Sequence, residues 1–276
     1  MNKHFNYIVP IFNKEDILPQ TLAGIEKCGG SGSKVILVVD GCTDNSESIV
    51  DNYIKNSSHN AIKLKMPNVH MLLSVNEGLR NITGGFSVIM QDDIILEDVD
   101  MEKKVYDQYQ RIKNLGMISF RYGLNLKRSP LLSTIKNGFE SMVTVCDTIQ
   151  STDDYADYLK AEHGKFYPRM CAINGPNVIP WSLFTKLGVF DENLAPYGYD
   201  DPEYCIRALK ANYINGLLPV KYTSEEAWGG TRRSKAFKKE ANRILTRNRK
   251  YVWKKHDSFL KDYLKHATIY QSTETI

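Results

Sequence analysis

Residues 34–40 read KVILVVD, and this near-continuous apolar run leads directly into the polar turn DGCTDNS (40–46) and a helical pattern at 44–57. A strand that is apolar at almost every position is typical of a parallel sheet whose two faces are both covered by helices. The stretch therefore predicts a strand, a turn and a helix, which is the repeating unit of an α/β fold.

The same alternation extends over the first 120 residues or so. Strand-like runs lie at 6–12, 34–40, 68–74, 86–92 and 116–122, and helical patterns lie between them at 15–28, 44–57, 76–83 and 98–114. We therefore expect an α/β fold with a mostly parallel, Rossmann-like sheet and helices on both faces. Residues 123–170 show no clean period and are expected to form loops and short helices that border a site.

Composition limits the class of protein. The 276 residues are 42% hydrophobic, enough to bury a substantial core in one domain. There is no signal-peptide pattern, and no apolar stretch approaches the roughly 18 residues that span a bilayer. The five cysteines are scattered, with no C-x-x-C, and the six histidines form no H-x-x-x-H. We expect a cytoplasmic protein without a disulfide framework or a zinc site.

Charge is unevenly distributed. Residues 232–276 carry about nine net positive charges and residues 1–231 about five net negative ones. The basic segment is predicted to be a helical C-terminal extension, either solvated and packed by its apolar residues, or in contact through 232–265 with an anionic membrane surface or with anionic ligand groups. We expect no nucleic-acid partner, because no stacking or groove-reading motif accompanies the charge.

Three polar clusters follow predicted strands: FNKED at 12–16, DGCTDNS at 40–46 and QDD at 91–93. Ligands of such sheets bind beyond the carboxyl ends of the strands, so the clusters are expected at one edge. Local roles are also open, because Asp44 with Glu47 fits a helix-capping box, and Asn13 and Glu15 could begin a helix. Asp40 has no such local role and could accept a hydrogen bond from a ligand.

The segment FSVIMQDDIIL (86–96) places Asp92 and Asp93 at the end of an apolar run. Two further Asp-Asp pairs, at 153–154 and 200–201, show that the pair alone proves little, and a plain turn is one interpretation. The other is a site for a hard divalent cation, Mg²⁺ or Mn²⁺, which takes oxygen ligands.

Four ordered segments, from about residue 5 to 215, resemble a family 2 glycosyltransferase with the GT-A fold. They are YIVPIFNKEDILPQTL, VILVVDGCTDNSESIV, GFSVIMQDDIIL and NGPNVIPWSLFTKLGVFDENLAPYGYDDPEYCIRALKAN. Their counterparts in the family are a strand ending P-V-Y-N, a D-D-G-S-T-D turn, a D-x-D or D-D metal motif, and an acceptor block with G-G-F-D-E and an E-D pair followed by arginine. This chain departs from the family at three positions, Val39, Cys42 and Asp200. It also has no histidine shortly after residue 201, and Glu225 or Glu226 could take the place of that histidine.

The resemblance implies an inverting, metal-dependent transferase with a nucleotide-sugar-binding half (1–122) and an acceptor-binding half (123–231) in a single domain, 1–231. The expected donor is a UDP-sugar and the acceptor a glycan, lipid-linked or other hydroxyl. Asp93 is expected to bind the metal, with Asp92 on the metal, its water or the ribose. Asp40 would meet the base, whose wall would be Pro10, Phe12, Asn13 and Glu15.

On the acceptor side, the attacking hydroxyl needs a carboxylate that takes its proton. Asp201 is the first candidate and Asp200 the second. A structural role is also open, since Asp201 could cap a helix with Pro202 at its first position, and Glu203 and Arg207 could form an ordinary i,i+4 pair.

Two other functions fit the same sheet. A nucleotidyltransferase that makes sugar nucleotides would need a glycine-rich basic loop after the first strand, whereas IFNKED (11–16) contains no glycine. A carbohydrate- or partner-binding protein without turnover would not need all the carboxylates at the expected edge.

Overall fold

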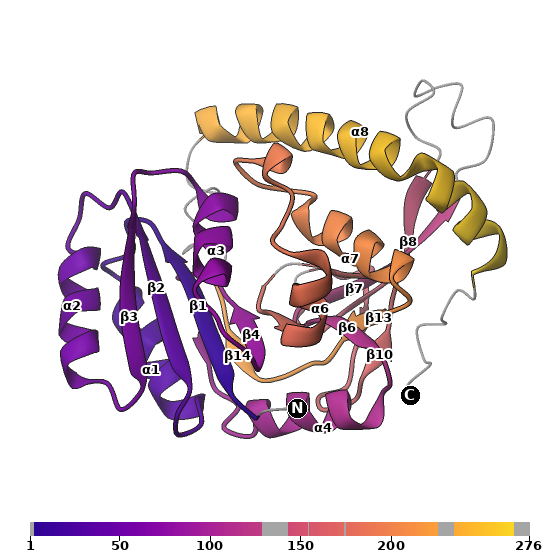
Figure 1. Ribbon diagram of the computed structural model, residues 1–276. Coiled ribbons are helices and arrows are strands. Elements are labelled where there is room, and N and C mark those ends of the chain that lie inside the picture. Colours follow the sequence, from indigo (N-terminus) through magenta and orange to yellow (C-terminus); the bar gives the residue numbers. More distant parts are fainter. Residues whose placement is uncertain (1–2, 129–142, 154, 174, 226–234, 268–276) are drawn as a thin grey trace.

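The computed structural model describes residues 3–128, 143–153, 155–173, 175–225 and 235–267. The apolar run at 34–40 forms strand β2 (Lys34–Asp40), and helix α2 (Ser46–Asn56) follows it. β2 lies between β1 (Phe5–Ile11) and β3 (Asn60–Met66) and is parallel to both. The predicted strand–turn–helix unit is therefore present (Figure 1).

These strands belong to an eight-stranded sheet of order β10-β13-β6-β12-β4-β1-β2-β3. The other members are β4 (Phe86–Ile89), β6 (Leu115–Ser119), β10 (Tyr167–Pro168), β12 (Asn177–Pro180) and β13 (Ile214–Leu217). β4 is parallel to β1, and β6 to β13, whereas β12 is antiparallel to both of its neighbours and β10 to β13. The predicted α/β class with a mostly parallel sheet is confirmed.

Helices cover both faces because the buried strands are apolar on both sides. Tyr7 and Val9 of β1 join the core beneath one set of helices, whereas Ile8 joins the core on the opposite face. The first set is α1 (Leu18–Cys28), α2 and α4 (Met101–Arg111); the second is α3 (Met71–Arg80), α6 (Trp181–Leu187), α7 (Asp200–Lys210) and α8 (Lys235–His266). Each fully buried side chain of this kind stabilises the fold by roughly 1.5–3 kcal/mol.

The predicted strand at 68–74 is wrong. The strand is β3, at residues 60–66, and α3 begins at Met71. Short apolar runs do not distinguish a strand from a buried helix, and here Leu72, Val75 and Leu79 repeat at the spacing of a helical face. β3 was not predicted because it is a half-exposed edge strand with polar residues. One of them, Lys63, pairs with Glu47 and Asp51 of α2.

The expectation of loops and short helices at 123–170 is also wrong. A second sheet, of order β11-β7-β8-β9, contains many of the described residues of this segment. Its strands are β7 (Tyr122–Arg128), β8 (Val143–Gln150), β9 (Leu159–Lys160) and β11 (Cys171–Ile173). The outer part of β8 is only partly buried, so its polar residues obscure the period-2 pattern that would have revealed it.

The basic C-terminal segment forms one 32-residue helix, α8, as predicted. Figure 1 shows α8 crossing over α7 along the side of the molecule that is drawn at the top. Val252 and Leu260 of α8 are buried in the same core as α7. Among the described residues, no helix combines the length and the apolar character that a membrane span requires. A two-stranded sheet of β5 (Ile95–Leu96) and β14 (Tyr222–Thr223) completes the fold.

Candidate functional site

The loops after β1, β2 and β4 meet at one edge of the sheet, because these three strands are parallel neighbours. Asp92, three residues beyond the last pair formed by β4, lies against the loop after β1. The backbone N–H of Phe12 donates to Oδ2 of Asp92 at 2.9 Å. Thr21 of α1 donates to the carbonyl oxygen of Asp92 at 3.1 Å. The geometry thus brings together the first and third polar clusters.

Asp92 is buried and Asp93 is half-buried. Burial raises the pKa of Asp92 to about 7, the nearby Lys14 ammonium opposes this shift, and the Asp93 carboxylate adds to it. Nζ of Lys14 lies 3.1 Å from Oδ2 of Asp93 and 3.6 Å from Oδ1 of Asp92. Sequence reasoning missed Lys14. The signal was the carboxylate pair itself, which needs a counter-charge when it is sheltered from water.

The loop after β1 is fastened to the turn after β2. Oδ1 of Asn13 accepts from the backbone N–H of Thr43 at 2.7 Å. Oε2 of Glu15 accepts from the backbone and side-chain N–H groups of Asn45 at 2.9 and 2.7 Å. Asn13 and Glu15 therefore join two loops and do not begin a helix. Between them, the backbone N–H of Lys14 donates to Ser46 at 2.8 Å.

Asp44 and Glu47 do not form the capping box considered from the sequence. Asn45 precedes α2 and makes no side-chain capping bond. The carboxylate of Asp44 instead accepts from the backbone N–H groups of Glu15 and Ser46, both at 3.0 Å. Glu47 pairs with two lysines of β3, Lys63 and Lys65.

Asp40 ends β2 and is buried. It does have a local role, contrary to the sequence argument: Oδ1 accepts from the backbone N–H of Val69 at 2.6 Å. Gly41 follows with φ +67°, and a Cβ there would lie 2.6 Å from Asn68. The end of β2 is thus packed against residues 68–69. Pro10 is buried within β1, and Phe12 is exposed at its end.

Asp200 and Asp201 form the first turn of α7, and neither is its N-cap. The preceding residue, Tyr199, occupies that position with a left-handed backbone, φ +66°. Oδ1 of Asp200 accepts from the backbone N–H of Gly198 at 3.0 Å, and burial raises the pKa of Asp200. Oδ1 of Asp201 accepts from Nδ2 of Asn177 at 2.9 Å. The capping role considered for Asp201 is therefore wrong.

The bond to Asn177 places Asp201 near the same sheet edge as Asp92 and Asp93. Asn177 is the first residue of β12 and pairs with Ile89, the last residue of β4. The chain just before β12 is equally close, because a Cβ on Gly175 would lie 2.7 Å from the side-chain oxygen of Gln91. Gln91 directly precedes the aspartate pair. The two pairs, more than 100 positions apart in the sequence, thus approach one another through adjacent strands.

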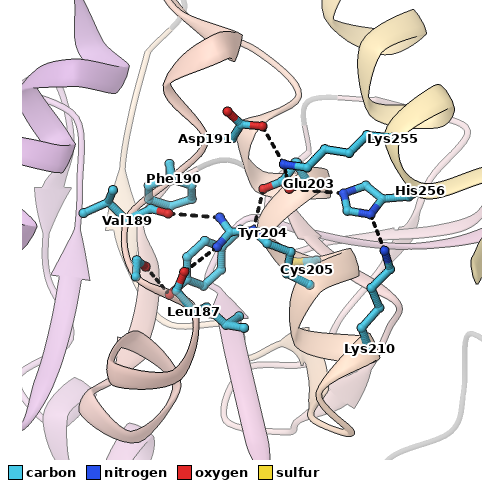
Figure 2. Close-up of polar contacts among 12 residues, drawn as sticks. Leu187, Val189, Phe190, Asp191, Glu203, Tyr204, Cys205, Lys210, Lys255 and His256 are labelled. Carbon is cyan, nitrogen blue, oxygen red and sulfur yellow. Dashed lines mark hydrogen bonds and ion pairs between the residues drawn. The ribbon is translucent and has the colours of Figure 1, made fainter.

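A buried cluster holds α7 against α8 (Figure 2). The Glu203 side chain has no exposed surface; it accepts from Nε of Arg207 and Nζ of Lys255, both at 2.8 Å, and lies 3.1 Å from Nε2 of His256. Burial raises the pKa of Glu203, but the hydrogen bond from His256 and the charge of Arg207 outweigh it and lower the pKa to about 2. Nδ1 of His256 lies 2.8 Å from Nζ of Lys210.

The expected i,i+4 pair of Glu203 and Arg207 exists, but it is part of a larger arrangement. Arg207 also donates to the carbonyl oxygens of Leu187 and Val189, at 2.7 and 3.0 Å. The start of α7, which carries Asp201, is consequently fixed from two sides. Sequence reasoning missed Lys255 and His256, because nothing in the pattern of α8 indicates which turn meets Glu203.

Among the described residues, no group of three or more His, Cys, Asp or Glu side chains could hold a metal ion. Two adjacent carboxylates with a lysine ammonium beside them nevertheless fit a cation that takes its remaining ligands from phosphate and water. Of the residues considered as a further ligand, Glu225 is exposed and Glu226 lies outside the described part.

Solved structures with a similar fold include those of S. aureus TarS and of a mannosyltransferase. S. aureus TarS matches with a TM-score of 0.55 and 16% identity over 80% of this chain, which spans 36% of the TarS chain. TarS 1–349 in complex with UDP matches with a TM-score of 0.56 and 14% identity, covering 95% of this chain and 72% of that one. The mannosyltransferase PcManGT from Pyrobaculum calidifontis, in complex with GDP-Man and Mn²⁺, matches with a TM-score of 0.55 and 16% identity, covering 96% and 76%.

No protein with a curated description matches the sequence. The sequence model of glycosyl transferase family 2 matches residues 7–144, which include most of β1, the turn after β2 and the Asp92-Asp93 pair. Because that match extends across half of its residues and the GT-A fold surrounds it, this chain belongs to glycosyl transferase family 2.

Proposed function

We propose that this glycosyltransferase moves a sugar from a nucleoside-diphosphate donor to a hydroxyl acceptor with inversion of the anomeric centre. The observation that carries the proposal is the approach of two carboxylate pairs at one sheet edge, one after β4 and one joined to β12 by the bond from Asn177 to Asp201. One pair is suited to a metal-bound diphosphate and the other to an acceptor hydroxyl.

On the donor side, residues 1–122 would hold the nucleotide. Asp40 would accept a hydrogen bond from the base, whose wall would be Pro10, Phe12, Asn13 and Glu15, while Asp92 and Asp93 would hold Mn²⁺ or Mg²⁺. When bound, the cation stabilises the negative charge that develops on the departing diphosphate. UDP is the first nucleotide to test, and the complexes of related folds with UDP and with GDP-Man and Mn²⁺ support a donor and metal of this class.

On the acceptor side, residues 123–231 would position a hydroxyl of a glycan or lipid-linked acceptor beside Asp201. The carboxylate of Asp201 would take the hydroxyl proton while the oxygen forms a bond to the anomeric carbon. The bond from that carbon to the diphosphate oxygen breaks on the opposite face, so the configuration inverts. Asp200 is the second candidate for this base.

α8 supports a further proposal, contact with an anionic membrane surface at its cytoplasmic side. Six exposed basic residues recur at intervals of three, four and seven, which places them along one face of the helix: Arg243, Arg247, Lys250, Lys254, Lys261 and Lys265. We call them the basic stripe. Asp257 lies beside it and pairs with Lys261. The apolar residues Val252 and Leu260 are buried against the domain, so the attraction would be electrostatic.

The test is the release of nucleoside diphosphate from a panel of UDP- and GDP-sugars, with and without hydroxyl acceptors, in Mn²⁺, Mg²⁺ and a chelator. We expect release that needs a divalent cation and rises with the right acceptor. Proton NMR of the first product would give the anomeric configuration, and an inverted centre is expected.

Other outcomes identify the alternatives. Pyrophosphate release from a nucleoside triphosphate and a sugar 1-phosphate would make the protein a nucleotidyltransferase. Tight binding of sugar nucleotides without any turnover across the panel would favour a binding protein on the same fold.

A further inference from the structure

Lys14 places an ammonium group against both carboxylates that we assign to the metal. Its Nζ lies 3.1 Å from Asp93 and 3.6 Å from Asp92. The three side chains are sheltered, with exposed fractions of 10% for Lys14, 12% for Asp92 and 14% for Asp93. Two adjacent carboxylates with so little exposure repel each other strongly, and the ammonium offsets that repulsion.

The backbone at Lys14 is fixed, so the contact does not depend on a loose loop. Asn13, the residue before Lys14, has a left-handed backbone with φ +50°, a conformation that few non-glycine residues adopt. The N–H of Lys14 donates to Ser46, and the residues on both sides bond to the turn at 43–45. The main chain is therefore anchored, while the flexible four-carbon stem of the lysine allows its ammonium group to change position.

We propose that Lys14 acts as an internal cation which occupies the carboxylate pair in the free protein and moves to the donor's phosphate oxygens when the divalent ion enters. The inference rests on the proposed function and assigns a positioning residue to the same site. A lysine ammonium is a compact point charge with three donors, and phosphate oxygens are its usual partners.

The consequence is that metal and nucleotide bind together. A divalent ion that binds alone must displace the Lys14 ammonium from the carboxylates. The ammonium then remains close to the divalent ion, and the two positive charges repel each other. With a diphosphate present, Lys14 has an anionic partner to move to, and the divalent ion gains phosphate ligands at the same time. The free protein is thereby protected from binding metal without a donor.

The test measures binding of Mn²⁺ alone, by calorimetry and by water-proton relaxation at pH 8, and then binding of Mn²⁺ with UDP. The variants are Lys14→Met, which removes the charge and keeps the stem, and Lys14→Arg, which keeps the charge. Lys104→Met is the matched control, since Lys104 pairs with the buried Asp98 at 2.7 Å in the same half of the chain. Circular dichroism establishes that each variant is folded.

We expect Lys14→Met to bind Mn²⁺ alone about tenfold more tightly or better, since a nearby positive charge no longer opposes the ion. In saturating Mn²⁺, UDP should bind more weakly to this variant than to the wild type. The factor by which UDP strengthens Mn²⁺ binding should therefore be smaller in the variant. Lys14→Arg and Lys104→Met should resemble the wild type in Mn²⁺ binding.

Two results would overturn the inference and are distinguishable. If the wild type binds Mn²⁺ with UDP but Lys14→Met leaves the affinity for Mn²⁺ alone unchanged, Lys14 is a fixed structural ion pair and the proposed function stands. If the wild type binds no Mn²⁺ even with UDP, the proposed metal-dependent function fails, and the inference fails with it.

Discussion

Asn177 on β12 donates a 2.9 Å hydrogen bond to the carboxylate of Asp201 on α7. β12 runs antiparallel between β4 and β6, so this single bond ties the helix of the acceptor side to the centre of the sheet. It also orients one oxygen of Asp201 toward the sheet. A base whose position is fixed by a neighbour in this way is already placed for proton transfer.

Asp201→Asn should separate catalysis from structure. Asparagine keeps an oxygen that can accept from Asn177, so the fold and donor binding should stay close to the wild type. It cannot take a proton, so sugar transfer should fall by roughly the 10²–10⁴-fold that a positioned base contributes. The measurements are the melting temperature, calorimetric binding of UDP, and the rate of transfer.

Asp200→Asn is the comparison for that experiment and should reduce the rate less. The reverse ranking would move the base to Asp200, whose pKa is raised by burial. If Asp201→Asn loses much stability but little transfer rate, the role of Asp201 is structural, through its bond from Asn177, and it is not the base.

Asp93→Asn should abolish transfer while the protein stays folded, because a neutral amide is a poor ligand for a hard cation. Binding of UDP should lose most of its dependence on Mn²⁺. The check is transfer and UDP affinity with and without a chelator. Near-normal transfer by the variant in the presence of chelator would show that the metal assignment is wrong.

Asp40→Asn and Asp40→Ala together test recognition of the base. Asparagine can still accept from the N–H of Val69, whereas alanine also removes this support from residues 68–69. If Asp40 accepts a hydrogen bond from the base, both variants should raise the dissociation constant of UDP by about tenfold or more, as expected for a bond to a charged group. Calorimetric titration with UDP and Mn²⁺ measures this. If only Asp40→Ala weakens UDP binding, Asp40 supports residues 68–69 and does not contact the base.

The parts of the fold that produce a local pattern of apolar residues could be predicted from the sequence. β2 lies at the predicted residues because both of its faces are buried and every position between Lys34 and Asp40 is apolar. β3 and the second sheet were missed because their strands are partly exposed and polar, and long-range pairing, which no local pattern contains, forms them.

For the site, spacing and strand ends predicted that the loops after β1, β2 and β4 would meet. The partners of the aspartates could not be predicted in the same way. Asn177 reaches Asp201 from 24 positions away and Lys14 reaches Asp93 from 79 positions away, so only the folded topology shows these contacts. At Asp201 a tertiary contact with Asn177 takes the place of the helix cap considered from the sequence, and at Asp44 a bond from Glu15 adds to the local one from Ser46.

The basic stripe on α8 predicts binding to anionic vesicles. Replacing Lys250, Lys254 and Lys261 with glutamine should weaken binding to vesicles that contain phosphatidylserine by several-fold or more, since each basic residue near such a surface contributes about 1 kcal/mol. Cosedimentation at low and high salt measures the effect. Wild-type binding that is equally strong on neutral vesicles, or absent on anionic ones, would remove membrane contact from the proposal.

Glu203→Gln should destabilise the protein in a pH-dependent way. The folded pKa of Glu203, about 2, lies below its ordinary value of 4.5, so the charged form stabilises the fold. This contribution is fully present above pH 4.5 and is lost as the pH falls from 4.5 toward 2. Glutamine leaves Arg207 and His256 without their carboxylate, while Lys255 keeps Asp191, so a loss of about 3 kcal/mol is expected at pH 7. Urea unfolding between pH 7 and pH 3.5 should show the difference between the two proteins narrowing as the pH falls below 4.5. Glu240→Gln, which breaks the exposed pair with Arg243, is the control and should change stability little at any of these pH values. A difference for Glu203→Gln that stays constant with pH would mean that shape and packing, rather than the charge of Glu203, hold α7 against α8.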